Sequence, residues 1–356
     1  MTGASAEPAG GPTAGVPARP VLVTGATGLV GAAVVRHLLA DGVAVRILRR
    51  DTSRLDLLGD AAARVEHATG DVTDADAVRE AVRGTGAVFH VAGVVALAPS
   101  ARARVVAVNA RGAAHVVDAC LAEGVAALVH TSSIAALGRP EGTPEAGRVV
   151  LDETAVWTPS RTNTAYAESK RAGEREALRG AAEGLHAVVV NPALVFGPGR
   201  ADEGTGAVVE RLRRGRLPAA PPGATAVVDV EDAAAGHVAA WRRGRSGERY
   251  VLAGESLQWT EILAVLARAF GVAAPRRVAP VWALWMAGAL AEALDALGGP
   301  EAALSRDGAR AAAGAFAYSA AKAERDLGVT FRPFAETARR IAAAPVAADG
   351  SGGGRA

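Results

Sequence analysis

The chain is poor in cysteine and in lysine, and both shortages limit what it can be. Cys120 is the only cysteine among 356 residues, so no disulfide framework can form within the chain, and a reducing, cytoplasmic location is expected. Of the 39 basic residues only Lys170 and Lys322 are lysines, and the arginines are scattered among acids to a net charge of +2. This pattern indicates a solvated surface and no nucleic-acid-binding patch, although the pI is near 9.0.

Long uninterrupted hydrophobic runs are also absent. The most apolar window, residues 278–297, contains Pro280, Glu292 and Asp295, so it is expected to be a buried or substrate-lining helix and no integral membrane segment. Residues 1–18 have neither the basic start nor the apolar core of a signal peptide. Because they are rich in Gly, Ala and Pro, they are predicted to be a disordered tail, and so are residues 346–356.

A glycine-punctuated turn near residue 25 is the main positive signal. Residues 21–24 are apolar or β-branched, as in a strand buried on both faces, and apolar residues return at helical spacing after Gly31. Gly25 and Gly28 lie between them. Glycine tolerates positive φ and has no Cβ to hold a pyrophosphate away from the N–H groups of a helix N-terminus. We expect a dinucleotide site, while the spacing Gly-x-x-Gly-x-x-Gly leaves open a glycine turn in another α/β protein.

The next predicted strand, residues 43–48, ends in Arg49 and Arg50, about 20 residues after the glycine turn. At that place an acidic residue binds the ribose 2′-hydroxyl of NAD, whereas arginine suits the 2′-phosphate of NADP. NADP(H) is therefore favoured over NAD(H). The alternative is that both arginines are solvated and Asp51 binds the hydroxyl.

Two aspartates follow the third predicted strand, residues 64–68. A carboxylate at the end of a strand can accept a hydrogen bond from the adenine amino group, and this role is favoured for Asp71. For Asp74 the same role and that of a helix cap are equally supported.

Short apolar strands alternate with helices, and further strands are predicted at residues 87–91, 127–131 and 186–190. The alternation predicts right-handed βαβ units and an α/β fold: a Rossmann-type doubly wound parallel sheet that binds ligands at the carboxyl ends of its strands. The expected domains are an NAD(P)-binding domain and a smaller mixed α/β C-terminal substrate-binding domain. The first comprises residues 19–191 with a returning segment at about 227–252, and the second residues 192–226 and 253–345.

Three stretches lie outside this alternation. Val227–Val230 and Arg249–Leu252 are expected to be short strands that return to the main sheet. Residues 138–163 show no sustained periodicity, and a connection of that length is expected to border the substrate.

Carbonyl reduction by a nicotinamide needs a proton donor at the carbonyl oxygen and a group that polarises this oxygen. Tyr166 and Lys170 lie four residues apart in a predicted helix, so both can face one ligand. A free tyrosine, with a pKa of about 10, is a poor acid at neutral pH, and a nearby lysine ammonium is expected to lower that pKa. Ser133 or Ser132, directly after a strand, can donate the second hydrogen bond. Asn109 either anchors a water that leads protons to Lys170 or is satisfied within its own helix.

The same tyrosine–lysine spacing recurs at Tyr318 and Lys322, so the spacing alone does not identify the catalytic pair. Tyr166 lies inside the strand–helix series. Tyr318 lies in the last predicted helical stretch, where Ser319 is a suitable N-cap. Position in the chain therefore favours Tyr166 and Lys170.

Together these motifs resemble the extended short-chain dehydrogenase/reductases, and within them the dihydroflavonol 4-reductase-like branch, which includes the hopanoid-associated sugar epimerase-like proteins. The resemblance spans residues 20 to about 340. It rests on Thr24-Gly-x-x-Gly28-x-x-Gly31, Asp71-Val72, His90-Val-Ala-Gly93, Asn109, Thr131-Ser-Ser133, Tyr166-x-x-x-Lys170, and Asn191-Pro192 with Gly197-Pro198-Gly199.

The resemblance implies a role for each matched position. Ser133 aligns with the catalytic serine of the family. The implied cofactor contacts are Gly25, Thr27, Gly28, Leu29, Val30 and Gly31 at the pyrophosphate, Asp71 and Val72 at the adenine, and Val91, Ala92, Gly93, Tyr166, Lys170, Pro192 and Val195 toward the nicotinamide. No metal site is implied, and a homodimer is expected from the family.

The expected function is that of an NADP-dependent oxidoreductase that reduces a ketone of an apolar or aromatic small molecule, or oxidises the alcohol, with Tyr166 as acid/base. Four large side chains of the second domain favour an apolar substrate, unless they belong to the core: Trp259, Trp282, Trp285 and Met286. Gly138 stands where sugar-nucleotide epimerases of the family carry tyrosine. The alternatives are an NAD-dependent sugar-nucleotide epimerase or dehydratase, and a catalytically silent NAD(P)-binding sensor or scaffold.

Overall fold

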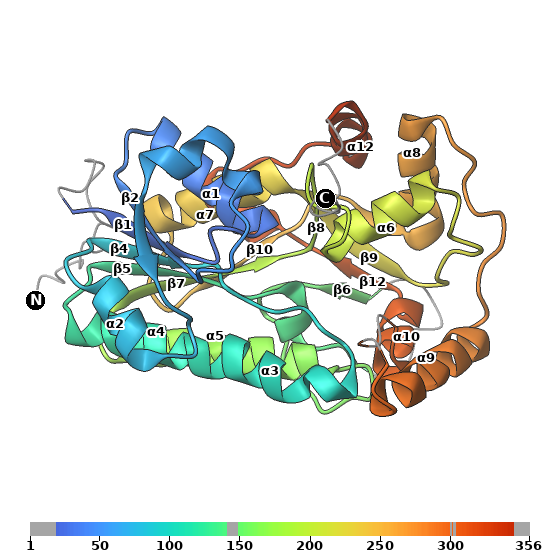
Figure 1. Ribbon diagram of the computed structural model, residues 1–356, viewed down its shortest axis with the longest axis horizontal. Coiled ribbons are helices and arrows are strands. Elements are labelled where there is room, and N and C mark those ends of the chain that lie inside the picture. Colours follow the sequence, from blue (N-terminus) through green and yellow to red (C-terminus); the bar gives the residue numbers. More distant parts are fainter. Residues whose placement is uncertain (1–18, 141–148, 300, 302–303, 345–356) are drawn as a thin grey trace, which may run out of the picture.

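A computed structural model of the chain describes residues 19–140, 149–299, 301 and 304–344 (Figure 1). The two tails expected to be disordered, 1–18 and 346–356, lie outside these residues. The described residues form a seven-stranded sheet between two layers of helices, with a smaller part beside it that contains two small sheets. The predicted fold class is confirmed.

The main sheet is parallel throughout, and its strands follow the order β10-β7-β5-β4-β1-β2-β3. From β1 the chain adds strands on one side of the sheet, and from β4 onward it adds them on the other, so the strand order reverses between β1 and β4. Doubly wound sheets bind ligands at the carboxyl ends of the strands at such a reversal. The strands are β1 (Val21–Thr24), β2 (Val45–Arg49), β3 (Glu66–Thr69), β4 (Ala87–His90), β5 (Ala127–Thr131), β7 (His186–Pro192) and β10 (Arg249–Leu252).

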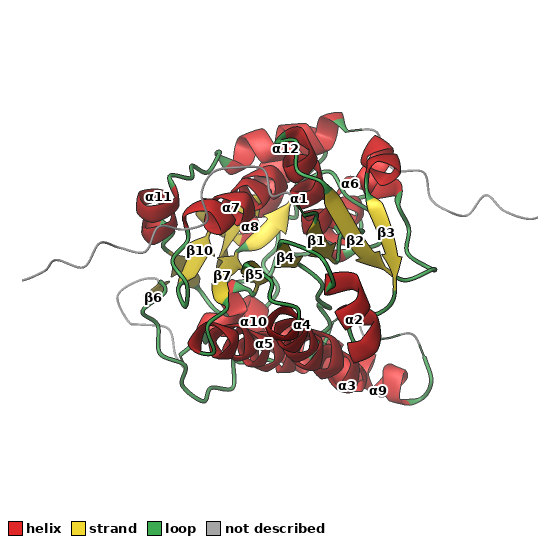
Figure 2. Cartoon of the chain, turned by 90° about the vertical axis from the view of Figure 1, so that its left-hand side faces the viewer, coloured by secondary structure: helices red, strands yellow, loops and turns green. Residues whose placement is uncertain are grey.

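Helices cover both faces of this sheet (Figure 2). On one face α1 (Leu29–Ala40) packs against α7 (Val230–Arg243), with α11 (Ala321–Leu327) beside α7. On the other face α4 (Gly112–Ala122) packs against both α2 (Ala75–Val82) and α5 (Ala165–Ala182). Shorter helical segments are η1 (Asp56–Arg64), η2 (Pro99–Ala101), α3 (Arg102–Val106), η3 (Ala107–Arg111) and η4 (Ile134–Leu137).

The core explains why the central strands are apolar at every position. Val23 of β1 packs in the core cluster that contains residues of α1 and α7. The preceding residue, Leu22, packs in a second cluster that contains residues of α2 and α4. Successive strand residues point to opposite faces, so burial of both faces requires consecutive apolar side chains.

The smaller part holds a three-stranded sheet, a strand pair and five helices among the described residues. Its strands are β6 (Val149–Leu151), β8 (Leu194–Phe196), β9 (Ala224–Asp229), β11 (Ser256–Gln258) and β12 (Phe316–Tyr318); its helices are α6 (Gly204–Arg213), α8 (Trp259–Phe270), α9 (Val281–Ala296), α10 (Arg306–Ala313) and α12 (Phe334–Ala343).

One of the two strands expected to return to the main sheet does not do so. Arg249–Leu252 returns as β10, which pairs with β7. The prediction for Val227–Val230 is wrong, because this stretch belongs to β9, which pairs with β8 and β11, and Val230 begins α7. Both stretches have the local pattern of a buried strand, and which sheet each joins is decided by partners distant in the sequence.

The region 138–163, whose sequence shows no sustained periodicity, contributes β6, and β6 pairs in parallel with β12. Tyr318 lies in β12 and not in a helix, since α11 begins only after Ala320. The Nζ of Lys322 donates to the Arg249 carbonyl over 2.9 Å and lies over the ring of Tyr250. Lys322 therefore attaches α11 to the sheet.

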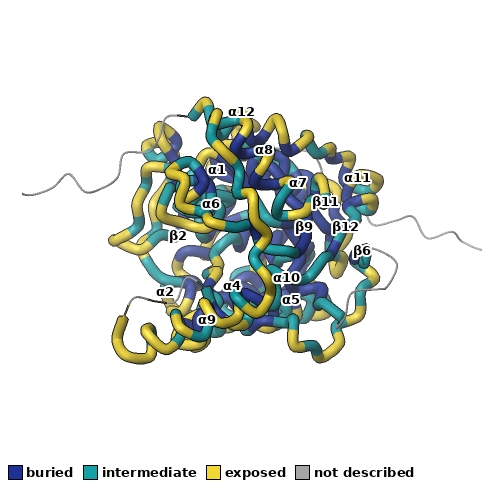
Figure 3. Tube along the Cα trace, turned by 90° about the vertical axis from the view of Figure 1, so that its right-hand side faces the viewer, coloured by how far each residue is buried: buried dark blue, intermediate teal, exposed yellow. Residues whose placement is uncertain are grey.

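Helix α9 is exposed, which corrects the expectation of a buried or substrate-lining helix at 278–297. Among its residues only Gly288 is fully buried, and Trp282 and Met286 are 70% and 56% exposed. Figure 3 shows α9 at the outer surface of the smaller part. Glu292 and Asp295, which argued in the sequence against a membrane span, bond to Arg306 and Ser100.

By length and composition, one described helical stretch could cross a membrane. It runs from Pro99 to Ala122, and 44% of its most apolar window is buried within the protein. Its second half is α4, which packs between α2 and α5. The core helix of a water-exposed fold satisfies the same criteria, so this stretch is weak support for a span.

Candidate active site

The three glycines of the turn after β1 are required for different reasons. Gly25 has φ +68°, and a Cβ there would lie 2.5 Å from the Ala92 nitrogen. A Cβ on Gly31 would lie 2.1 Å from the Gly25 carbonyl oxygen. At Gly28 the nearest atom would be 3.5 Å away, an ordinary contact. Packing within the protein therefore explains why Gly25 and Gly31 must be glycine. At Gly28 it leaves room for a side chain or a ligand.

The room at Gly28 lies at the N-terminus of α1. Gly28 is the N-cap, and no side chain caps the helix. Thr27, Leu29 and Val30 flank it, and Leu29 and Val30 also line the main cavity. Uncapped N–H groups at a helix N-terminus, beside a position without a Cβ, suit a pyrophosphate, so the residues present fit a dinucleotide.

The ends of β2 and β3 lie side by side where the adenosine half of such a ligand would extend. The Nε of Arg49 donates to His67 Nδ1 over 2.9 Å. Arg50 is 67% exposed, and its closest anionic contact is Asp71 Oδ2, 4.0 Å away. Of the two arginines, Arg50 is therefore the one whose guanidinium is free of a short bond to another described residue.

Asp71 and Asp74 have different roles. The Oδ1 of Asp71 accepts bonds from the N–H and hydroxyl of Thr73, while its Oδ2 faces Arg50. Val72 is buried against Gly112. Asp74 is the N-cap of α2 and accepts from the N–H groups of residues 76 and 77. The helix-cap interpretation of Asp74 is thus the one that the geometry supports.

The positions expected at the nicotinamide end also gather at one edge. Val91 and Gly93, which follow β4, line the cavity together with Pro192 and Val195. Ala92 donates its N–H to Thr24 Oγ1 over 3.3 Å, which closes the end of β4 onto β1. A Cβ on Gly93 would lie 3.3 Å from Lys170 Nζ, so glycine leaves room beside that ammonium.

Tyr166 and Lys170 project from the first turns of α5 into the same cavity. Thr164 is the N-cap of this helix and accepts from the N–H of Ala167. Lys170 Nζ donates to the carbonyl of Thr131, at the end of β5, over 2.7 Å. Ser133 follows that strand, and its Oγ accepts from the N–H of Ala135 over 3.2 Å. The Ser133 hydroxyl also hydrogen-bonds the side chain of Tyr166 at the cavity wall.

Burial alters the acidity of both groups. Burial raises the pKa of Tyr166 above its usual value, while hydrogen bonding by Ser133 and the charge of Arg139 act to lower it. Burial lowers the pKa of Lys170 to about 8, opposed by the negative charge of Glu174. The pKa of Tyr166 is thus raised and not lowered as expected, because the loss of solvent outweighs the opposing effects of Ser133 and Arg139.

Ser132 and Ser133 face different partners. The Oγ of Ser132 donates to Glu174 Oε2 over 2.7 Å, and Asn191 Nδ2 donates to the same oxygen over 2.8 Å. Arg249 Nη1 contacts the other oxygen, Oε1, at 3.0 Å. Of the two serines, Ser133 is the one whose hydroxyl faces Tyr166, whereas the hydroxyl hydrogen of Ser132 is taken by Glu174.

Glu174 was missed in the sequence, although a signal was present. It lies four residues after Lys170 on α5, so Tyr166, Lys170 and Glu174 occupy one helical face. A glutamate that is only 3% exposed needs partners for its charge, and it has three.

Asn109 is buried and satisfied, but not within its own helix. Its Oδ1 accepts from the N–H of Val94 over 2.8 Å, and its Nδ2 donates to the Val94 carbonyl and to Ser169 Oγ. It joins the loop after β4 to α5. Its Oδ1 accepts one hydrogen bond and can accept a second, so the water-anchoring role stays a prediction.

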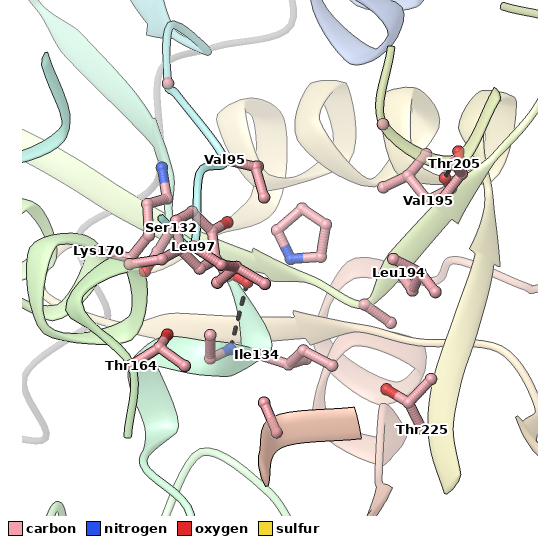
Figure 4. Close-up of a pocket in the computed structure, with 18 of the residues that line it drawn as sticks. Val95, Leu97, Ser132, Ile134, Thr164, Lys170, Leu194, Val195, Thr205 and Thr225 are labelled. Carbon is pink, nitrogen blue, oxygen red and sulfur yellow. Dashed lines mark hydrogen bonds between the residues drawn. The ribbon is translucent and has the colours of Figure 1, made fainter. Parts of the chain in front are cut away.

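The cavity has a volume of about 540 Å³, and its walls are mostly apolar. Figure 4 shows Lys170 and Ser132 on one side, and Leu194, Val195 and Thr205 on the other. Trp259 lines it, whereas Trp282, Trp285 and Met286 of α9 do not. Within the described ranges, no group of three or more His, Cys, Asp or Glu side chains could hold a metal ion.

Comparison with known proteins agrees with this geometry. Residues 21–253 match the NAD dependent epimerase/dehydratase family. The chain is 34% identical over 312 residues to a putative dihydroflavonol 4-reductase of Synechocystis, covering 86% of this chain and 89% of that protein. The chain belongs to the NAD-dependent epimerase/dehydratase family. Its extended short-chain dehydrogenase/reductase character, expected from the motifs, is confirmed, and it is an NAD(P)-dependent oxidoreductase.

Other members of the family show the same relationship. Cinnamoyl-CoA reductase 1 of Oryza sativa is 34% identical over 264 residues, with 70% of this chain and 75% of that protein covered. The crystal structure of a dTDP-glucose 4,6-dehydratase from Streptomyces venezuelae with NAD bound superposes with a TM-score of 0.73 at 22% identity, covering 90% of this chain and 95% of the other. The second comparison concerns the fold alone.

Proposed function

We propose that the chain is an NADP-dependent reductase that converts a ketone of an apolar or aromatic small molecule to an alcohol. The observation that carries the proposal is the apolar cavity into which Ser133, Tyr166 and Lys170 project beside the glycine turn. Its walls draw on residues 192–226 and 253–345, which supports the expectation that these segments bind substrate.

The chemistry assigned to each side chain follows from its bonds. NADPH, when bound, supplies the hydride that reaches the carbonyl carbon. Tyr166 gives its hydroxyl proton to the carbonyl oxygen, and the raised pKa keeps that proton in place until charge develops on the oxygen. Ser133 donates a hydrogen bond to the same oxygen.

Lys170 acts on the tyrosine through its charge. Its ammonium, held by the Thr131 carbonyl, stabilises the phenolate that remains once Tyr166 has lost its proton. Solvent then returns the proton to Tyr166 and completes the cycle. Asn109 has a positioning role here, because it holds the Val94 loop and Ser169 of α5 together.

The preference for NADP rests on Arg50. Its exposed guanidinium, close to the end of β2, suits a 2′-phosphate, and Arg49 stands beside it with one bond to His67. The lone buried cysteine supports a cytoplasmic location. A homodimer stays a prediction.

The test is consumption of NADPH and NADH by the purified chain with aryl ketones, steroid-like ketones and nucleotide sugars. Reduction of ketones with NADPH, lost in Tyr166→Phe, is expected. Preference for NADH by about tenfold or more would overturn the cofactor assignment. Conversion of a nucleotide sugar with copurifying cofactor and no net NADPH consumption would replace the reductase by an epimerase. Unchanged activity in Tyr166→Phe would contradict the catalytic role.

A further inference from the structure

Arg139 is the one arginine whose side chain lines the active-site cavity among the described residues. It follows η4 and Gly138, whose φ of +85° turns the chain at this point. A Cβ on Gly138 would lie 3.2 Å from the Trp157 ring, so the glycine also allows close packing against the following segment. The chain thus turns sharply just before it places a charge in the cavity wall.

Both backbone groups of Arg139 are held by one turn. Its N–H donates to Asn163 Oδ1 over 2.9 Å, and its carbonyl accepts from Thr162 Oγ1 over 2.9 Å. The next residue of that turn, Thr164, is the N-cap of the helix that carries Tyr166. Arg139 is therefore positioned by the same short segment that positions the proposed acid.

Among the described residues, the side chain of Arg139 has an aromatic neighbour but no anionic partner. Its Cζ lies 5.7 Å from the centre of the Phe316 ring, and Phe316 also lines the cavity. Its Nε is buried and has no hydrogen-bond partner in the described part of the chain. Arg139 is partly buried, and its buried Nε–H lacks an acceptor, which is costly; a ligand group that carries negative charge and lies in the cavity would supply that acceptor.

We infer that Arg139 is an anion subsite of the cavity and binds a carboxylate carried by the substrate. The inference rests on the proposed reductase function and narrows its substrate class to apolar or aromatic ketones that bear an acid group. The guanidinium stacked on Phe316 offers a planar edge of N–H donors, which matches the planar carboxylate. Leu97, Trp259 and Ala312 supply the apolar wall for the rest of the molecule.

Electrostatics agree with a position close to the reacting group. The charge of Arg139 acts on Tyr166 to lower its pKa. A carboxylate bound at Arg139 would neutralise that charge and so remove its lowering effect on the pKa of Tyr166.

The experiment compares matched ketones that differ only in charge: an aryl keto acid and its methyl ester. In the unaltered chain the acid is expected to be the better substrate. In Arg139→Met, kcat/KM for the acid should fall by about 10- to 100-fold, mostly through KM, and KM for the ester should change by less than about twofold. Arg139→Lys should retain part of the preference, because it keeps the charge but not the planar edge. Arg171→Met is the matched control, since Arg171 stacks on Trp157 and is absent from the cavity wall.

Equal loss for acid and ester, or no preference for the acid in the unaltered chain, would overturn the subsite. If neither ketone is turned over, the reductase proposal fails. The subsite is then tested by the binding of benzoate, measured as a change in Tm. A benzoate-dependent rise in Tm that is lost in Arg139→Met but kept in Arg171→Met would support it, and an equal rise in all three would overturn it.

Discussion

The Oγ of Ser132 lies 2.7 Å from Oε2 of Glu174 and donates its hydrogen to that carboxylate. The bond joins the end of β5 to the middle of α5, and so links the strand that carries Ser133 to the helix that carries Tyr166 and Lys170. The same carboxylate also pairs with Arg249 of β10 and accepts a hydrogen bond from Asn191 of β7. One buried acid thus holds three strands and a helix around the proposed catalytic groups.

Glu174→Gln is expected to lower both stability and the pKa of Lys170. An amide cannot accept at both of its ends, so at least one buried donor loses its partner, at a cost of about 1–3 kcal/mol. The negative charge of Glu174 raises the pKa of Lys170 against the effect of burial, so its loss lowers that pKa further. The measurements are Tm and the pH profile of ketone reduction. Glu168→Gln, on the exposed side of α5 where Glu168 pairs with Arg102, should change neither. An unshifted pH profile in Glu174→Gln would contradict this role.

Ketone reduction should decline as the pH rises through about 8, the pKa of Lys170. The protonated lysine stabilises the tyrosine phenolate, and that help is lost with the proton. Tyr166 itself stays protonated there, because burial raises its pKa. This loss of activity is not caused by unfolding that the deprotonation of Lys170 would drive. Its folded pKa lies below the unfolded value of 10.5, so between these values the unfolded chain binds more protons and folding gains stability with pH. The check is kcat against pH, with far-UV circular dichroism at each point; a flat profile to pH 10 would exclude the role of Lys170.

Arg50→Ala should raise KM for NADPH by about 10- to 100-fold and leave KM for NADH within about twofold, because a charged contact to the 2′-phosphate is lost. Arg49→Ala should have a smaller effect, since the Nε of Arg49 already bonds to His67. Steady-state kinetics with both cofactors test this. A parallel rise in both KM values would show that Arg50 does not discriminate between them.

Gly28→Ala and Gly31→Ala should separate cofactor binding from folding. The new Cβ at position 31 meets the Gly25 carbonyl at 2.1 Å, a backbone atom with nowhere to move, so a loss of about 1–3 kcal/mol in stability is expected. At position 28 the nearest contact is 3.5 Å, so Tm should be unchanged while dinucleotide affinity falls. Thermal unfolding with and without NADPH distinguishes the two. Normal affinity in Gly28→Ala would place the pyrophosphate elsewhere.

Features that depend on short stretches of chain were predictable. The glycine turn, the seven strands of the main sheet and the helical face shared by Tyr166 and Lys170 follow from residues within one or two turns or strands of each other. The placement of Ser133 at the end of β5 follows from the polarity of parallel strands. The choice of Ser133 over Ser132 came from the family motif and not from periodicity, and it stays a prediction.

Contacts between distant segments could not be predicted. Nothing near Val227 specifies that β9 joins β8 and β11, and nothing near Val149 specifies its pairing with β12. Asn109 bonds to Val94 and Ser169 because the π-helical turn that carries it lies against both the loop after β4 and α5. The exposure of α9 was not predicted because apolar residues show only that a helix can be buried. Whether another segment covers the helix depends on the tertiary structure.

By itself the sequence determined the parallel sheet, the dinucleotide turn and the tyrosine–lysine face, because backbone geometry ties each to a fixed local spacing. Only the tertiary structure decided that Ser132 bonds to Glu174, that Arg49 and not Arg50 makes a short side-chain bond to His67, and that Arg139 lines the cavity against Phe316. The reason is physical: burial and charge pairing depend on which segments pack together, and that packing is a property of the whole fold.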